Sequence, residues 1–192
     1  MMESVITRRH IRNLVLAGFM GTGKSAVGRL AAARLRFRFV DTDALIEAKA
    51  GKRITEIFAQ LGEPAFRELE REVVAGLGEY DRAVIATGGG VVVDPRNLAS
   101  LREHALVVCL WASPETIYRR TRHSSRRPLL KEANPQARIE TLLAQRECFY
   151  REGDILITTD SRSVAEVMQH VLHEFLLATK KGVPARSGAS KQ

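Results

Sequence analysis

Five short apolar runs, rich in β-branched residues, alternate along the chain with segments of helical periodicity. The runs are apolar throughout, which is typical of strands buried on both faces of a parallel sheet. Helices between the strands would cover those faces. We therefore expect an α/β fold of three layers, α/β/α, with a central five-stranded parallel sheet. The predicted strands are residues 13–18, 39–41, 83–88, 105–112 and 155–160.

Helical periodicity is plainest in residues 63–80, where apolar side chains recur on one side and charged side chains occupy the others. Two further helices are predicted over 136–150 and 164–177. At 192 residues with 45% hydrophobic content, the chain can bury one sizeable core. We expect a single domain over 13–178, a flexible arm over 1–12, and a basic tail over 179–192 with too few apolar side chains to order itself.

The formal net charge of +8 is concentrated at the ends of the chain. The arm carries +2 and the tail +4, which leaves +2 for the domain. Single arginines in a nearly balanced domain suit a phosphorylated small molecule better than a polyanion groove, so we do not expect a nucleic-acid partner. With no signal peptide and no run of membrane-spanning length, we expect a cytosolic protein with no membrane partner. Cys109 and Cys148 are expected to be buried free thiols.

Residues 18–25, Gly-Phe-Met-Gly-Thr-Gly-Lys-Ser, match the phosphate-loop pattern G-x-x-x-x-G-K-[ST]. The glycines let backbone N–H groups point at phosphate oxygens, Lys24 adds a charge for the β- and γ-phosphates, and Ser25 offers a hydroxyl to Mg²⁺. The alternative is a glycine-rich turn with a chance Lys-Ser, but the strand before it and the helix after it favour phosphate binding. The predicted ATP-binding residues here are Gly21, Thr22, Gly23, Lys24, Ser25 and Ala26.

Asp41 and Asp43 follow the second predicted strand. Residues two apart on extended backbone project to the same side, so both carboxylates are expected beside the phosphate loop, where the carboxyl ends of the strands meet. One could hold Mg²⁺ and the other a substrate hydroxyl. The alternative is a helix N-cap at Thr42 or Asp43. The strand 83–88 ends in glycine where many P-loop ATPases place a metal aspartate, which leaves Asp41 as the metal candidate.

The phosphate loop, Asp41-Thr42-Asp43 and the triple glycine 88–90, in this order, resemble the shikimate kinase family over about residues 14–177. The resemblance implies a P-loop kinase fold with a mobile lid at about 119–131. It also implies transfer of the γ-phosphoryl group of MgATP to the 3-hydroxyl of shikimate, with ATP and shikimate as small-molecule partners and Mg²⁺ as cofactor. We expect a monomer.

The resemblance further implies which residues hold the acceptor. Arg67 matches the arginine that grips the shikimate carboxylate, and Glu70, three residues later, could fix its guanidinium. Arg146 matches a second substrate-binding arginine; it also follows Leu142 and Leu143 on one helical side, where a charge needs an anionic partner. A solvated charged face is the alternative for Arg67, and an alkyl chain lying along apolar surface for Arg146. The implied substrate-binding residues are Asp43, Arg67, Gly88, Gly89, Gly90 and Arg146.

On the nucleotide side, Arg127 matches a lid arginine that reaches the ATP phosphates, and Arg120 matches an earlier nucleotide contact. Arg162 is a candidate to pack against adenine, although Ser163 could instead cap a helix there. The implied catalytic residues are Lys24, Asp43 and Arg127, and the implied metal ligands are Ser25 and Asp41. Two rival functions stay open: a kinase of another hydroxy acid such as gluconate, and a nucleotide-dependent regulator that binds nucleic acid.

Overall fold

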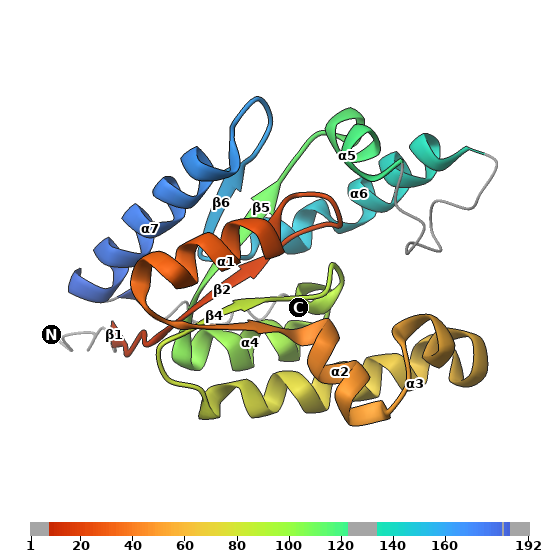
Figure 1. Ribbon diagram of the computed structural model, residues 1–192, viewed down its shortest axis with the longest axis horizontal. Coiled ribbons are helices and arrows are strands. Elements are labelled where there is room, and N and C mark those ends of the chain that lie inside the picture. Colours follow the sequence, from red (N-terminus) through yellow and green to blue (C-terminus); the bar gives the residue numbers. More distant parts are fainter. Residues whose placement is uncertain (1–7, 123–133, 182, 185–192) are drawn as a thin grey trace, which may run out of the picture.

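The computed structural model describes residues 8–122, 134–181 and 183–184 (Figure 1). Its central sheet has five strands in the order β3-β4-β2-β5-β6, and every neighbouring pair is parallel. The predicted fold class is therefore confirmed. Each strand lies where its apolar run predicted it, and most end one or two residues earlier than expected. The strands are β2 (Asn13–Ala17), β3 (Arg38–Asp41), β4 (Ala83–Ala86), β5 (Ala105–Trp111) and β6 (Ile155–Thr158).

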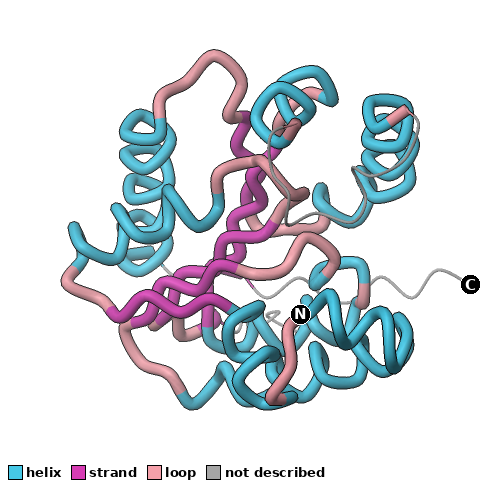
Figure 2. The backbone as a smooth tube through the Cα atoms, turned by 45° about the vertical axis from the view of Figure 1, so that its right-hand side comes forward, coloured by secondary structure: helices cyan, strands magenta, loops and turns pink. Residues whose placement is uncertain are grey.

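Helices cover both faces of the sheet (Figures 1 and 2). On one face, Leu14 and Leu16 of β2 pack in a buried cluster with α1 (Lys24–Leu35) and α7 (Val164–Lys181). On the other face, Val15 and Ala17 pack in a second buried cluster with a second layer of helices. Because successive residues of β2 enter opposite clusters, the strand must be apolar throughout. The helices of this second layer include α4 (Pro95–His104), α5 (Pro114–Thr121), α6 (Pro135–Arg151) and the carboxyl-terminal part of α3 (Ile54–Gly76).

Helix α3 and the short α2 (Thr42–Ala50) extend beyond the sheet and pack on each other around Ile46, Ile57 and Phe66 (Figure 1). The helix was predicted over 63–80, and both of these bounds lie later in the sequence than the bounds of α3. It begins at Ile54, continues past a kink where Gly62 is non-helical, and is followed by the 3₁₀ turn η1 (Leu77–Glu79). Gly62 breaks the regular pattern because its φ of 79° lies outside the helical region.

The two ends of the described chain lie side by side. Strand β1 (Arg8–Arg9) pairs antiparallel with β7 (Val183–Pro184). Arg9 also forms an ion pair of 2.8 Å with the nearly buried Asp154, which accepts a hydrogen bond from the Val107 backbone. The expected boundaries at 12 and 178 fall inside this ordered arrangement, since α7 continues to Lys181 and both flanking segments contribute a strand.

Both cysteines are free thiols, as predicted, but the expected burial is confirmed only for Cys109 and is wrong for Cys148. Cys109 is buried in β5, and burial raises its thiol pKa to about 12, whereas Cys148 is exposed on α6. Across the ranges that the structure describes, no helix combines the length and apolarity that a membrane span requires.

Candidate active site

The phosphate loop, residues 18–25, connects the carboxyl end of β2 with the first turn of α1. Gly18 has a φ of 128°, and a Cβ at this position would collide with the carbonyl oxygen of Leu110 on β5. Only glycine fits there. Gly23 is the N-cap of α1 and offers no side chain, so the first N–H groups of α1 face the loop. The loop therefore has the backbone geometry of an anion site.

Lys24 is nearly buried, with 9% of its surface exposed. Its ammonium donates hydrogen bonds to the carbonyl oxygens of Gly18 at 2.7 Å and Phe19 at 2.9 Å. Thr22 is also buried and donates from its hydroxyl to the same Phe19 carbonyl at 2.8 Å. These bonds hold the ammonium against the backbone of the loop.

Asp41 is the last residue of β3 and the N-cap of α2. One carboxylate oxygen accepts the backbone N–H of Asp43 at 3.1 Å, and the other accepts the Ser25 hydroxyl at 3.3 Å. The expected extended geometry of the pair is wrong, because α2 already begins at Thr42 and Asp43 lies in its first turn. The capping alternative also needs correction: the cap is Asp41, and not Thr42 or Asp43.

The glycine turn, residues 88–90, follows β4 and leads into the 3₁₀ turn η2 (Val91–Val93). Its first N–H, on Gly88, donates to the buried Thr42 hydroxyl at 3.0 Å, which joins the turn to α2. A Cβ on Gly88 would lie 2.9 Å from a carboxylate oxygen of Asp43 and 3.3 Å from one of Glu70. Both carboxylates therefore converge on the turn. Sequence reasoning did not single out Thr42 for this contact.

Arg67 projects from α3 between two glutamates. Its guanidinium lies 2.8 Å from Glu70 on one side and 2.8 Å from Glu63 on the other. The Glu70 side chain is buried and the Glu63 side chain is 61% exposed. Burial lowers the pKa of Arg67, but the two glutamates outweigh it and the net pKa is raised. Burial raises the pKa of Glu70, Arg67 opposes that shift, and the charge of Asp43 adds to it.

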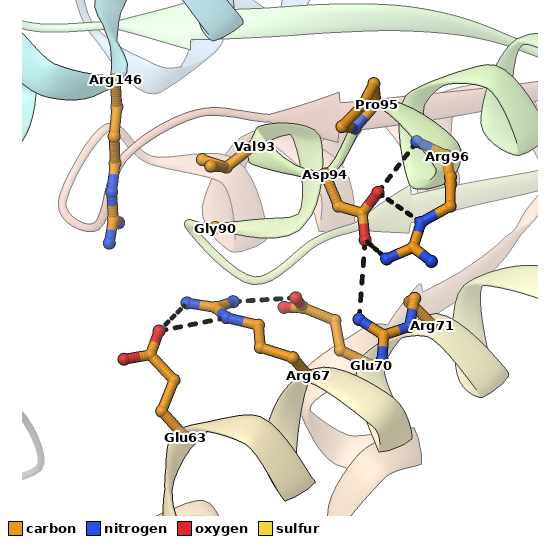
Figure 3. A pocket seen from close by; sticks show the side chains of 10 residues that line it. All are labelled: Glu63, Arg67, Glu70, Arg71, Gly90, Val93, Asp94, Pro95, Arg96 and Arg146. Carbon is orange, nitrogen blue, oxygen red and sulfur yellow. Dashed lines mark hydrogen bonds and ion pairs between the residues drawn. The ribbon is translucent and has the colours of Figure 1, made fainter.

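Arg67 and Arg146 face one another across a pocket of about 540 Å³, called here the arginine pocket (Figure 3). Arg146 descends from α6 with its guanidinium over the Phe19 ring of the phosphate loop, 5.9 Å from the ring centre. A Cβ on Gly90 would lie only 2.7 Å from an Arg67 nitrogen, so glycine lets the guanidinium approach the backbone. The lining residues are Glu63, Arg67, Glu70, Arg71, Gly90, Val93, Asp94, Pro95, Arg96 and Arg146.

Six of these ten lining residues were not singled out from the sequence: Glu63, Arg71, Val93, Asp94, Pro95 and Arg96. Asp94 is the N-cap of α4. Its carboxylate forms ion pairs with the guanidinium groups of Arg96, at 2.8 Å, and Arg71, at 3.6 Å (Figure 3). The hydrogen bonds from Arg96 lower the pKa of Asp94. The Asp94-Pro95 pair is a typical helix start, an N-cap followed by proline, and it could have revealed both α4 and this edge of the pocket.

On the nucleotide side, Arg120 reaches from α5 to the phosphate loop. It donates to the Thr159 hydroxyl at 2.9 Å, to the Thr159 carbonyl at 2.8 Å and to the Gly21 carbonyl at 3.3 Å. Arg162 is exposed and contacts His170 at 3.2 Å. Next to it, Ser163 and Glu166 form a reciprocal cap at the start of α7, so the capping alternative does occur there. Arg127 lies outside the described residues, as does most of the predicted lid.

The fold and the site together define a P-loop nucleotide-binding protein of the α/β class with a second, arginine-lined pocket beside the loop. Comparison with known proteins narrows this class. The shikimate kinase family model matches residues 20–176. Shikimate kinase of Geobacter metallireducens is 47% identical to this chain, in an alignment that covers 84% of this chain and 90% of the Geobacter protein. That of Deinococcus radiodurans is 46% identical, covering 90% and 87%. The chain belongs to the shikimate kinase family.

Solved structures of shikimate kinases also match this chain. Shikimate kinase from Acinetobacter baumannii, in complex with shikimate, superposes with a TM-score of 0.82 at 35% identity, covering 89% of this chain and 95% of that one. A gluconokinase from Sinorhizobium meliloti superposes with a TM-score of 0.54 at 16% identity, covering 90% and 96%. At that identity, the gluconokinase shows a shared fold and no more.

Proposed function

We propose that this chain transfers the γ-phosphoryl group of ATP to the 3-hydroxyl of shikimate, giving shikimate 3-phosphate and ADP. The observation that carries the proposal is the arginine pocket beside the phosphate loop, with Arg67 and Arg146 facing each other across it. Planar guanidinium groups match a carboxylate through paired hydrogen bonds. Membership of the shikimate kinase family and the shikimate bound by the Acinetobacter baumannii protein support the choice of acid.

In this proposal the acceptor is held at three points. Arg67 and Arg146 bind its carboxylate, the glycine turn lies against its ring, and Asp43 receives the 3-hydroxyl. Asp43 suits that role because its carboxylate lies close to the turn, near Gly88. A hydroxyl held this way loses much of the freedom that makes reaction between two separate molecules slow.

The transfer step follows from these positions. The 3-oxygen of shikimate forms a bond to the γ-phosphorus while the bond from that phosphorus to the β,γ-bridging oxygen breaks, and ADP leaves. Asp43 accepts the hydroxyl proton. Lys24 and the N–H groups at the start of α1 stabilise the charge that develops on the phosphoryl oxygens. Arg127 and Arg120 are proposed to add positive charge from the lid side, and Arg162 a contact to the adenine.

Mg²⁺ is the proposed cofactor. Its protein ligands would be Ser25 and Asp41, whose side chains lie 3.3 Å apart beside the loop. The hydroxyl and carboxylate suit a hard cation that takes its remaining ligands from water and phosphate. Within the described ranges, no group of three or more His, Cys, Asp or Glu side chains could hold a metal ion. Bound Mg²⁺ would neutralise charge on the β- and γ-phosphates.

A coupled assay of ADP release tests the function. Purified protein with MgATP is offered shikimate, gluconate or no acceptor, and shikimate 3-phosphate is identified by mass. We expect ADP release that depends on shikimate and matches product formation. Turnover of gluconate in preference to shikimate would establish the rival kinase function instead.

The rival regulator function rests on the basic ends of the chain, and deleting them tests it. A chain limited to residues 13–178, which lacks all seven Arg and Lys residues of the arm and the tail, is expected to keep shikimate turnover. If it loses turnover but the full chain retains nucleic acid on a column, the assignment of catalysis to the central domain is wrong. The monomeric state and cytosolic location stay predictions; sedimentation of the full chain at assay concentration checks the first.

A further inference from the structure

Tyr150 carries a hydroxyl in the interior of the second helical layer. The residue lies on α6, one helical turn after Arg146, and none of its surface is exposed. The hydroxyl donates a hydrogen bond of 2.7 Å to the carbonyl oxygen of Gly89, the middle residue of the glycine turn. A single buried side chain thus joins the helix of one pocket arginine to the turn whose last residue, Gly90, lines the pocket.

Arg146 lies close enough to act on this hydroxyl. Burial raises the pKa of Tyr150 to about 12, although the charge of Arg146 and a hydrogen bond from it oppose the shift. The hydroxyl therefore keeps its proton at any ordinary assay pH, and its bond to Gly89 does not switch with pH. Trp111 packs edge-on against the Tyr150 ring, with the ring centres 6.3 Å apart, which fixes the ring independently of the hydroxyl.

The glycine turn also lies beside the phosphate loop. A Cβ on Gly89 would lie 3.4 Å from the Met20 backbone nitrogen and 3.7 Å from the Gly18 carbonyl oxygen. The backbones of the turn and the loop are therefore separated by little more than the space of one methyl group. Because Tyr150 holds the carbonyl of the same glycine, it acts on the place where the two halves of the site meet.

We propose that Tyr150 is a positioning residue, which fixes the glycine turn relative to Arg146 and so sets the distance between the acceptor carboxylate and the phosphate loop. It does not touch the substrates. The inference rests on the proposed kinase function. The inference predicts that loss of the Tyr150 hydroxyl weakens binding of shikimate but not of ATP. The phosphate loop keeps its internal hydrogen bonds when the hydroxyl is removed.

The test compares Tyr150→Phe, which removes only the hydroxyl, with Tyr118→Phe as a matched control; the Tyr118 ring packs against the same core. In the ADP-release assay we expect Tyr150→Phe to raise the KM for shikimate about fivefold, the size expected for one buried hydrogen bond. The KM for ATP should stay close to wild type, and the melting temperature should fall by only the few degrees that the loss of one buried hydrogen bond costs. Tyr118→Phe should leave both KM values unchanged.

Two further measurements keep the test decisive. Trp111, the sole tryptophan of the chain, is a fluorescent reporter beside Tyr150, so shikimate can be titrated without ATP. The Kd should rise in Tyr150→Phe even if that variant turns over too slowly to assay. In a double-mutant cycle with Arg146→Lys, the combined effect should be smaller than the product of the single effects.

The outcomes separate this inference from the proposed function. If wild type does not phosphorylate shikimate, the function is wrong. If wild type does, but Tyr150→Phe matches it in shikimate KM and Kd, the positioning role is wrong. Equal rises in both KM values, accompanied by a larger fall in melting temperature, would also overturn it, because they indicate a general packing defect.

Discussion

The phosphate loop and the arginine pocket are neighbours built in different ways. The loop is eight consecutive residues whose glycines and backbone N–H groups create the site, and Lys24 is held by carbonyls of the loop itself. The pocket draws its lining residues from α3, α6, the turns after β4 and the start of α4, and these elements are spread over more than 80 residues of the sequence, from Glu63 to Arg146. A local stretch of chain therefore specifies the first site, whereas the second exists only once the sheet has brought its elements together.

Charge is also handled differently in the two regions. The loop attracts an anion with backbone dipoles and one ammonium. The pocket holds Arg67, Arg71 and Arg96 in ion pairs, and Arg67 pairs with both the exposed Glu63 and the buried Glu70. An exposed pair contributes little, about 0–1 kcal/mol, and can be exchanged for a ligand, whereas a buried pair is costly to break. We expect an acceptor carboxylate to replace Glu63 and to leave Glu70 in place.

The largest effect is expected in the loop. Lys24→Met removes the ammonium that serves the phosphoryl group, and kcat/KM should fall about 10³-fold, as when a preorganised charge donor is lost. Steady-state kinetics with MgATP and shikimate measures the fall, and a thermal melt confirms that the variant is folded. A folded Lys24→Met variant with near-normal turnover would show that the loop works through its backbone alone.

Asp43→Asn should lower kcat about 10²-fold, because the amide cannot accept the hydroxyl proton. The KM for ATP should hardly change, since Asp43 is proposed to serve the acceptor. Single-turnover measurement of the phosphoryl transfer step checks this. If Asp43→Asn instead raises the KM for ATP, the Asp43 carboxylate serves the metal and the nucleotide at the phosphate loop, and not the acceptor.

Within the pocket, Glu70→Gln and Glu63→Gln form a matched pair. Glu70→Gln weakens a hydrogen bond between charged groups, and the KM for shikimate should rise about tenfold. Glu63→Gln removes only the exposed partner and should leave the KM within about twofold. Shikimate titrations of both variants decide the matter, and equal effects would contradict the division between exchangeable and fixed partners.

A smaller effect on shikimate binding is expected at Gly90, where the backbone of the glycine turn approaches the Arg67 guanidinium. Gly90→Ala places a methyl group 2.7 Å from an Arg67 nitrogen, and the flexible side chain can move aside. We expect the KM for shikimate to rise a few-fold with little loss of stability. Gly76→Ala, in open space near the end of the same helix that carries Arg67, is the control and should change neither.

The smallest effect concerns the scaffold that both regions share. Burial lowers the pKa of His104, with the charge of Arg12 adding to the shift, below the ordinary value of 6.5. The unfolded chain therefore takes up the proton first, so stability is full above about pH 6.5 and falls as the pH drops below it. The loss is about 1.4 kcal/mol for each pH unit at most. Urea unfolding of His104→Gln at pH 8 and 5.5 should show a weaker pH dependence than wild type; an unchanged dependence would place the acid sensitivity elsewhere.

The strands and the phosphate loop could be predicted from the sequence because their signals are local. A strand covered on both faces is apolar at every position, and the loop is contiguous. Asp43 was placed on extended backbone because a residue pattern does not reveal that Asp41 already caps a helix. The partners of Gly88 and Gly89, Thr42 and Tyr150, could not be predicted, since each contact joins elements about 46 to 61 residues apart.

The pairing of β1 with β7 has a consequence for the order in which the molecule is made. Translation runs from the amino end, so Arg8–Arg9 is synthesised before the other described elements and Val183–Pro184 after them. The partner strand of β1 is therefore missing while the other elements are made, and pairing between segments so far apart in the sequence is slow. The five sheet strands and the helices that carry the pocket all precede α7. A nascent chain can therefore assemble its whole catalytic centre before its two ends are joined.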